Sequence, residues 1–272
     1  MEGLILDYQY QPGDVFHLTP YSDLHDDARA CALADVRAHM AKRAALPNPI
    51  FCGLGDIGNW VFDGNDRRRQ PSTPRPEFAD QDEYIDRVIE EQAFRYKGLP
   101  WAFIGMGNHE TAVNNHHHTN VTKRLCTLLG VPYAGYSSLV RFRFIGSSGK
   151  IDCTSTMLWH HGAWGGKVQK GFGGARDYAR GFDDWDFFCY GHNHQLNVHH
   201  ETRVSMSIRG HLEDRDVFFV NTGTFQRGMT QGGSPAYSEI KGYGPVALSC
   251  PLIKIQPRGS GGVKVSVEVG DC

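Results

Sequence analysis

The sequence predicts an α/β fold in which two stacked sheets are flanked by helices. In the first half, short apolar runs alternate with helix-like stretches, a pattern typical of βα units. From Leu139 onward apolar and polar residues mostly alternate, as on strands with one buried face. Segments in this order pack as layers around sheets. Because no internal repeat or interdomain linker is evident, we expect residues 1–272 to form one domain.

The first half contains three predicted strands, each followed by a loop and a helix. The strands are expected at 15–18, 49–52 and 99–106, and the helices at 28–45, 78–97 and 121–129. In the second half, strand alternation or a buried apolar run covers 139–144, 156–159, 204–208, 217–220 and 263–269.

Composition indicates a soluble protein of a reducing compartment. The seven cysteines are odd in number and form no Cys-x-x-Cys pair. The chain opens with Glu2 and Asp7 rather than with basic residues, and no apolar run approaches the roughly 20 residues that a membrane span needs. We therefore expect a cytoplasmic protein without membrane contact. The net charge of −2 excludes a global attraction to nucleic acid, so a local patch or a metal would have to hold any polyanion.

Ligand-type side chains follow the predicted strands. The candidates are Asp23 with His25, Asp56, Asn108 with His109, His160 or His161, and His192 with His194. Because strand ends in a sheet-based fold can converge at one edge, we expect these side chains to lie close together. Such a mixture of oxygen and nitrogen donors suits Mn, Fe, Zn or Ni better than Ca or a thiolate-bound structural zinc.

Two pairs of candidates stand two residues apart. If the chain is extended after the strand that precedes Gly191, the rings of His192 and His194 leave on the same side and face one point. The alternative is a turn that merely ends the strand. Asp23 and His25 allow the same interpretation, with an Asp that caps the next helix beside a surface His as the alternative.

Each of two polar segments allows two interpretations, one with contact to substrate and one without. Residues 67–76 are rich in arginine and proline, which predicts a solvated loop, with contact to substrate phosphates as the alternative. His116, His117 and His118 are expected in a polar loop near the opening of the site, where they serve either no function or substrate contact.

The order of the motifs resembles that of the calcineurin-like metallophosphoesterase superfamily. Asp-x-His, Gly-Asp, Gly-Asn-His-Glu, His-Gly and Gly-His-x-His follow one another between Asp23 and His194. The segment 221–224 is similar to a turn that closes the core in many members, and the tail at 237–253 resembles bacteriophage and prophage members. The resemblance implies a four-layer αββα sandwich of two mixed β-sheets flanked by helices, the metallo-dependent phosphatase fold. It also implies two bound divalent ions, with manganese ahead of iron, zinc or nickel.

The resemblance also implies a role for each candidate. Asp56 would bridge the two ions, Asp23, His25 and His194 would bind the first, and Asn108, His192 and one histidine of the pair His160 and His161 would bind the second. In the family this histidine is followed directly by Gly, as His161 is, or by one residue and then Gly or Pro, as His160 is.

A mechanism follows from this arrangement. Two divalent ions roughly 3.5 to 4 Å apart would clamp a phosphate oxygen, lower the pKa of a bridging water and present hydroxide in line with the leaving group. His109 would act as general acid or as a hydrogen-bond donor to the charged transition state. Glu110 either orients His109 or is a surface carboxylate.

The chain departs from the family at one motif. Many phosphatases of the superfamily carry Gly-Asp-x-x-Asp-Arg-Gly, whereas this chain continues from Asp56 with Ile-Gly-Asn-Trp-Val. The departure argues against a protein Ser/Thr phosphatase and leaves open which group orients His109. A cation that binds phosphate would have to come from elsewhere, and the candidates are Arg67 to Arg69, His117 and Arg227.

The sequence therefore predicts a metal-dependent phosphoesterase. A nucleotide or nucleic acid phosphodiester is favoured as substrate over a small phosphomonoester, because of the arginine-rich segment and the phage-like tail. The alternatives are a phosphomonoesterase or protein phosphatase and, from another class, a non-catalytic scaffold that keeps the fold for protein interaction.

Overall fold

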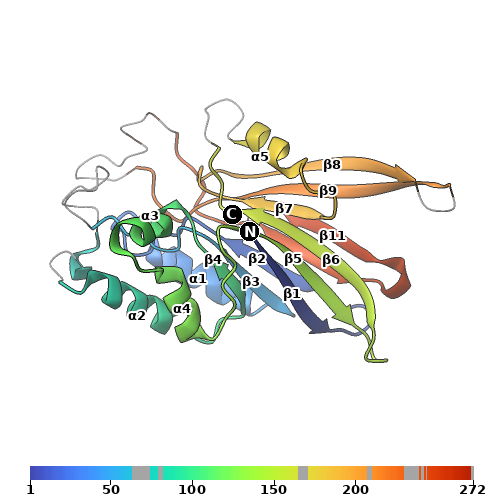
Figure 1. Ribbon diagram of the computed structural model, residues 1–272, viewed down its shortest axis with the longest axis horizontal. Helices are drawn as coiled ribbons and strands as arrows, with labels where there is room; N and C mark the ends of the chain where they lie inside the picture. The colour runs from blue at the N-terminus through green and yellow to red at the C-terminus, as the bar shows by residue number, and fades with distance from the viewer. Residues whose placement is uncertain are drawn as a thin grey trace.

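The computed structural model of the chain describes residues 1–62, 74–78, 82–164, 171–206, 210–229, 239, 242 and 244–270 (Figure 1). Arg67, Arg68 and Arg69 and part of the segment 237–253, including Tyr237, lie outside these ranges.

The five α-helices named below all precede the strand Phe187–Tyr190, and the four elements named below that follow this strand are themselves strands. The strands are β1 (Glu2–Gln9), β2 (Phe16–Tyr21), β3 (Pro49–Leu54), β4 (Trp101–Gly105), β5 (Ser137–Ile145), β6 (Ile151–His160), β7 (Phe187–Tyr190), β8 (Leu196–Met206), β9 (Leu212–Thr222), β10 (Leu252–Pro257) and β11 (Val263–Glu268). The helices are α1 (Leu33–Ala44), α2 (Tyr84–Tyr96), α3 (Asn108–His117), α4 (Val121–Leu129) and α5 (Phe172–Ala179).

The strands form two mixed sheets. A six-stranded sheet has the order β1-β5-β6-β7-β9-β8, and a five-stranded sheet has the order β11-β10-β2-β3-β4. In the smaller sheet β2, β3 and β4 are parallel, and β10 joins β2 antiparallel. In the larger sheet β6, β7 and β9 are parallel, while β5 and β8 pair antiparallel with β6 and β9. The parallel strands bring their carboxyl ends to one edge in each sheet.

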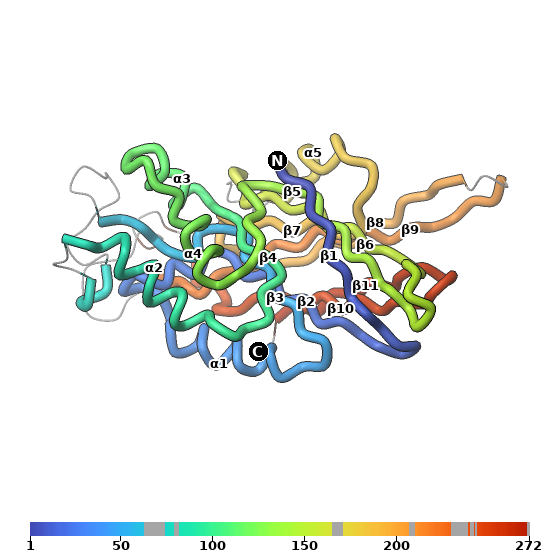
Figure 2. Tube along the Cα trace, turned by 60° about the horizontal axis from the view of Figure 1, so that its bottom comes forward, coloured from blue at the N-terminus to red at the C-terminus, as the bar shows by residue number. Residues whose placement is uncertain are grey.

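Hydrophobic side chains fill three spaces between four layers. Between the sheets, Phe103 stacks on Trp159 with ring centroids 6.1 Å apart. Met40 of α1 and Leu125 of α4 pack on the outer face of the five-stranded sheet, and Ala179 of α5 packs on the outer face of the six-stranded sheet. Figure 2 shows α1 and α5 on opposite sides of the strands. The predicted αββα sandwich of two mixed sheets flanked by helices is confirmed.

Helix α3 corrects one expectation, because His116 and His117 lie in this helix rather than in a loop. Its sequence has almost no apolar face, and Val113 is its one buried hydrophobic residue. At the start of the helix the Glu110 carboxylate accepts a hydrogen bond of 2.7 Å from the backbone N–H of the N-cap residue Gly107, which is one of the two hydrogen bonds of a capping box. Hydrophobic periodicity alone could not reveal a helix that is held in this way.

The described part of the chain contains no helix long and apolar enough to cross a membrane.

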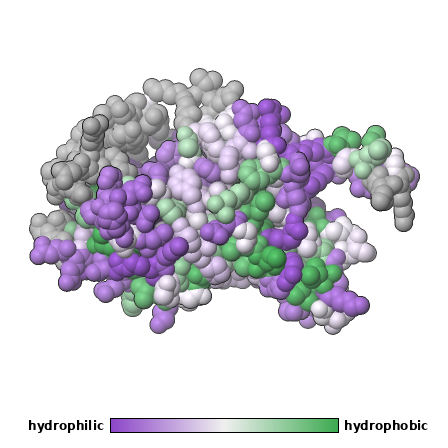
Figure 3. Space-filling view, in the orientation of Figure 1, coloured by the Kyte–Doolittle hydropathy of each residue, from purple (hydrophilic) through white to green (hydrophobic). Residues whose placement is uncertain are grey.

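On the face in Figure 3, hydrophobic residues gather in the middle and at lower right, and hydrophilic residues cover much of the left half. The six described cysteines are buried and free.

We predict that Gly105→Ala lowers the free energy of unfolding by about 1–3 kcal/mol. A methyl group there would overlap the buried Trp159 ring and lie 2.9 Å from the Gly135 carbonyl oxygen. Gly3→Ala is the control, because nothing lies within 4 Å of its added methyl group. Urea unfolding of both variants measures the difference, and equal stabilities would contradict this account of the packing.

Candidate metal centre

The sequence-predicted residues meet at the carboxyl ends of strands from both sheets. Asp23, Asp56 and Asn108 follow β2, β3 and β4 of the five-stranded sheet, whereas His161 and His192 follow β6 and β7 of the six-stranded sheet. Neither sheet alone carries the whole set, so the site depends on the packing of one sheet against the other.

Among the described residues, three overlapping groups of side chains have the geometry to hold a metal ion. They are Asp23, His25 and His194; His25, Asp56 and His109; and Asp56, His161 and His192. Within each group the potential ligand atoms all lie within 4.8 Å of one another. Since His25 and Asp56 each belong to two groups, the three groups form one continuous centre.

In the first group the rings of the two histidines lie close together beside Asp23. The Nε2 atoms of His25 and His194 are 3.2 Å apart, and His194 Nε2 lies 3.4 Å from Asp23 Oδ1. His25 Nδ1 is buried and has no hydrogen-bond partner among the described residues. The atoms that meet in this group are the two Nε2 atoms and the Asp23 carboxylate, a set of nitrogen and oxygen donors that suits a transition-metal ion.

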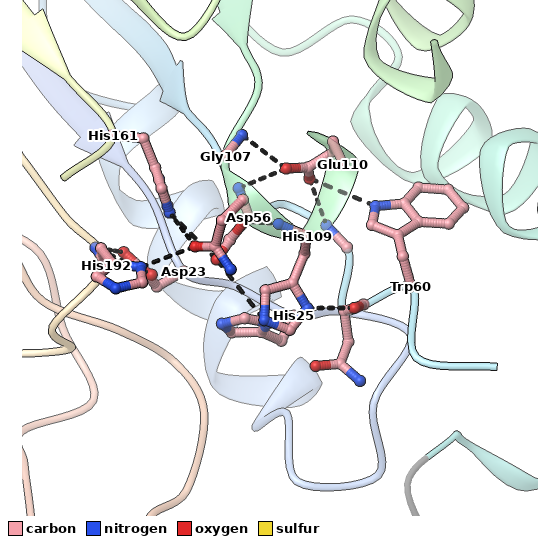
Figure 4. A network of polar contacts seen from close by, with 12 residues as sticks. Asp23, His25, Asp56, Trp60, Gly107, His109, Glu110, His161 and His192 are labelled. Carbon is pink, nitrogen blue, oxygen red and sulfur yellow. Dashed lines mark hydrogen bonds and ion pairs between the residues drawn. The ribbon is translucent and has the colours of Figure 1, made fainter. Parts of the chain in front are cut away.

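The Asn108 amide oxygen joins the last group. Asn108 Oδ1 lies 3.1 Å from His161 Nε2 and 2.7 Å from His192 Nδ1, while His161 Nε2 is 3.2 Å from Asp56 Oδ2 (Figure 4). His161 Nδ1 donates to the Leu54 carbonyl oxygen at 2.9 Å, which directs Nε2 towards Asp56. These are the residues that the family resemblance implies for the second ion.

The two histidines of the doublet lie in different surroundings. His161 is fully buried inside the centre, whereas His160 belongs to none of the three groups. His160 Nδ1 accepts a hydrogen bond of 2.8 Å from the backbone N–H of Gly162. Its ring packs against Trp164 and against Tyr178 of α5. The geometry therefore favours His161 as the ligand of this pair.

Five of the site residues have left-handed backbone rather than extended backbone. The φ angles are 52° at Asp23, 48° at His25, 50° at Asp56, 72° at His192 and 58° at His194. Strand-like alternation was therefore the wrong reason to expect convergence of the i and i+2 pairs. Left-handed backbone is uncommon for residues other than glycine and costs of order 1–3 kcal/mol, and such residues cluster at functional sites.

Two glycines leave room for the carboxylates. A Cβ at Gly191 would collide with the Asp23 carboxylate and the Ser22 hydroxyl. A Cβ at Gly107 would lie 2.7 Å from both the Asp56 backbone nitrogen and His161 Cε1. The glycines before the ligand-type residues thus allow the close approach of segments that are distant in the sequence.

The site holds buried carboxylates in their charged form. Burial opposes ionisation of Asp23, but its hydrogen bond to His194 and the charge of that ring hold the pKa at about 2. Burial likewise opposes ionisation of Asp56, and the nearby His161 and His109 keep its pKa well below the usual range. Burial alone would lower the pKa of His161, yet Asp56 raises it to about 10. Two buried carboxylates in one site require positive charge, which the protonated His161 ring supplies here and a divalent ion would supply in its place.

His109 takes its orientation from a main-chain oxygen. Its Nδ1–H donates to the carbonyl oxygen of Asn59, and its Nε2 lies 3.9 Å from Asp56 Oδ2. Its ring centroid is 4.7 Å from that of His25. Asn59 stands three residues after Asp56, at the position of the second Asp in the sequence pattern Gly-Asp-x-x-Asp-Arg-Gly. Sequence patterns carry no signal for a contact to a main-chain oxygen.

Glu110 is neither a surface carboxylate nor the group that orients His109. It is buried and accepts hydrogen bonds from the backbone N–H of Asp56 at 2.9 Å and of Gly107 at 2.7 Å. It also accepts from the N–H of Gly58 and from Nε1 of Trp60 (Figure 4). Burial, together with the Asp56 charge, raises the pKa of Glu110 to about 8. Glu110 thus ties the start of α3 to the loop that carries Asp56.

The segment 221–224 supports the first group of ligands. Thr224 Oγ1 donates to the main-chain oxygen of Asp23 at 2.7 Å, and Asn221 Nδ2 donates to Asn193 Oδ1 at 2.8 Å. This segment therefore braces both the Asp23 turn and the turn between His192 and His194.

The two described candidates for a phosphate-binding cation contact residues outside the three groups of ligands. Arg227 Nη2 donates to Asp35 at 3.1 Å, and the His117 ring lies 5.1 Å from the ring of Phe62. Arg67 to Arg69 are outside the described residues.

No family model and no curated protein matches this chain. Among solved structures, the chain is similar to the calcineurin-like phosphoesterase YfkN from Bacillus subtilis, with 12% identity, a TM-score of 0.46 and coverage of 94% of this chain and 90% of that one. A metallophosphoesterase from Sphaerobacter thermophilus shares 14% identity, with a TM-score of 0.40 and coverage of 95% and 89%. A single mutant of Vps29 from Entamoeba histolytica shares 11%, with a TM-score of 0.33 and coverage of 94% and 100%.

We predict that Glu110→Ala lowers the free energy of unfolding by about 3 kcal/mol, because it leaves several buried N–H groups without an acceptor. Glu268→Ala, which removes an exposed partner of Lys254, is the control and should change stability by less than about 1 kcal/mol. Urea unfolding measures both. A loss at Glu110 no larger than that at Glu268 would show that these hydrogen bonds do not stabilise the site.

Proposed function

We propose that the chain is a metal-dependent phosphoesterase in which two divalent ions share the Asp56 carboxylate. The observation that carries this proposal is the position of Asp56, which belongs to two of the three metal-competent groups and lies beside His109. We also infer that the two sheets act as one catalytic domain, since each contributes ligands.

The proposed ligands divide between two ions. Asp23, His25 and His194 would bind the first, Asn108, His161 and His192 would bind the second, and Asp56 would be the ligand that both share. His160 is left out because its ring packs away from these residues. When bound, the ions would polarise a phosphate oxygen and lower the pKa of a water molecule, so that hydroxide forms near neutral pH. Manganese is the first choice, with iron, zinc and nickel as alternatives.

His109 is the proposed catalytic residue. Its Nδ1–H is committed to the Asn59 carbonyl oxygen, which leaves Nε2 on the side of Asp56 and His25. The side chain is 14% exposed, so substrate can reach it. In its protonated form Nε2–H would donate to the leaving oxygen or stabilise charge on the phosphate in the transition state.

A phosphodiester of a nucleotide or nucleic acid is the proposed substrate class. The arginine-rich segment at 67–76 and the phage-like tail support this choice, and both are features of the sequence. A phosphomonoesterase or protein phosphatase is the alternative. A non-catalytic scaffold is less favoured, because the chain retains every type of ligand and these side chains converge.

We predict that the protein with added Mn²⁺ hydrolyses bis(p-nitrophenyl) phosphate faster than p-nitrophenyl phosphate and loses both activities after chelation. Release of p-nitrophenolate measures the rates, and re-addition of Mn²⁺ should restore them. If the metal-loaded protein hydrolyses neither ester, the result would favour the non-catalytic scaffold over the phosphoesterase. If the monoester reacts faster, the preference for phosphodiesters is wrong.

We predict that Asp56→Ala abolishes binding of both metals, whereas His109→Ala retains them and loses about 100-fold or more in kcat. His160→Ala is the matched control and should retain both metals and turnover, unlike His161→Ala. Elemental analysis after gel filtration gives the metal content. Equal metal loss in Asp56→Ala and His109→Ala would refute the division of roles, and metal loss in His160→Ala would refute the choice of His161.

A further inference from the structure

One buried carboxylate next to the centre has no place in the mechanism so far. Asp27 is 1% exposed and belongs to none of the three metal-competent groups. Its Oδ1 accepts a hydrogen bond from the backbone N–H of Asn59, and its Oδ2 accepts from the N–H of Trp60 at 3.0 Å and from the Tyr84 hydroxyl. Asp27 therefore holds two consecutive main-chain N–H groups of the turn at Asn59 and Trp60.

This turn does not adopt a relaxed conformation. Trp60 has a φ of 54°, in the left-handed region that bulky side chains avoid. Two main-chain hydrogen bonds, from His25 to the Asp56 oxygen at 3.1 Å and from Asp26 to the Ile57 oxygen at 3.0 Å, lay residues 25–27 alongside the chain that leads into the turn. A strained turn persists only where its surroundings determine it, and here the Asp27 carboxylate supplies two of the contacts.

The same turn orients His109. The Asn59 carbonyl oxygen accepts from His109 Nδ1–H, and a partner on one ring nitrogen sets the tautomer and direction of the other. Because this partner is a main-chain oxygen, its position depends on whatever holds the Asn59 and Trp60 amides. Asp27 is the side chain that accepts from both of them.

We propose that Asp27 is a positioning residue for His109, acting through the Asn59 carbonyl oxygen. This inference rests on the proposed function, in which His109 donates a proton or a hydrogen bond to the leaving group. A shift of about 1 Å in a catalytic group can cost roughly 100-fold in rate, so loosening of this turn should reduce turnover without any loss of metal.

The adjacent Asp26 offers a matched control. It is equally buried, but its carboxylate accepts from Gln92 and Arg95 at 2.7 Å each and from the Tyr96 hydroxyl, all on α2. Asp26 thus anchors a helix through its side chain, whereas Asp27 anchors the turn. Asp26→Asn should lower stability without altering the chemistry of the leaving group.

The kinetic test uses aryl methyl phosphodiesters with 2,4-dinitrophenol, p-nitrophenol and phenol as leaving groups. A group that assists departure matters most when the leaving group is poor. We predict that Asp27→Ala lowers kcat at least about 10-fold for the phenyl ester and less than about 3-fold for the dinitrophenyl ester, with little change in KM. His109→Ala should show the same trend more strongly, and Asp26→Asn should show none.

The double variant separates a shared role from two independent ones. Since Asp27 is proposed to act through His109, Asp27→Ala should cause no further loss of kcat in the His109→Ala background. Asp27→Asn keeps one acceptor oxygen and should recover part of the loss, and it serves as the test variant if Asp27→Ala does not fold. Equal losses for all three leaving groups, or additive losses in the double variant, would overturn the proposal.

An NMR measurement tests the positioning without catalysis. In the zinc-loaded protein, the ring ¹⁵N shifts of His109, assigned by difference from His109→Ala, should show the proton on Nδ1, with a mixture of tautomers in Asp27→Asn. An unchanged Nδ1–H tautomer in Asp27→Asn would overturn the role of Asp27. A shifted tautomer in a protein that hydrolyses no ester would leave the positioning intact and refute the proposed function instead.

Discussion

The Asp56 carboxylate lies close to ligand-type side chains from both sheets. It lies 3.2 Å from Nε2 of His161, which comes from the six-stranded sheet, and it belongs to a second group with His25 and His109 from the five-stranded side. A buried carboxylate is stable only when positive charge or several donors surround it. Asp56 thus couples the packing of the two sheets to the assembly of the site.

Around this carboxylate, other buried acids bind backbone amides rather than a cation. Glu110 accepts from the N–H groups of Asp56 and Gly107, and Asp27 accepts from those of Asn59 and Trp60. Such contacts hold left-handed and strained backbone in place while leaving the metal-competent side chains free to face one another. The site therefore combines a group of potential ligands with a surrounding framework that determines the conformation of their loops.

Hydrophobic periodicity predicts the parts of the fold that bury a regular face. It identifies β2, β3, β4 and the fourth helix, whose bounds match the expected 121–129. It misses α3, because a capping carboxylate rather than an apolar stripe holds that helix, and it places the starts of α1 and α2 too early. The residues before α1 pair instead with other segments, as Cys31 does with Gln226.

The order of the motifs predicts which residues form the centre. It does not predict the backbone conformation that brings their side chains together. Asp23, His25, His192 and His194 have left-handed backbone, which a sequence pattern based on extended strands cannot reveal. The orientation of His109 depends on a carbonyl oxygen that every residue type possesses. The choice between His160 and His161 depends on which ring packs against α5, a tertiary contact without a local signal.

A crystal structure of the manganese-loaded protein, with anomalous scattering recorded at the manganese edge, bears most closely on the proposed centre. The account predicts two anomalous peaks joined by Asp56, one in contact with Asp23, His25 and His194 and the other with Asn108, His161 and His192. A single peak, a peak bound by His160, or two peaks without a shared Asp56 ligand would contradict it.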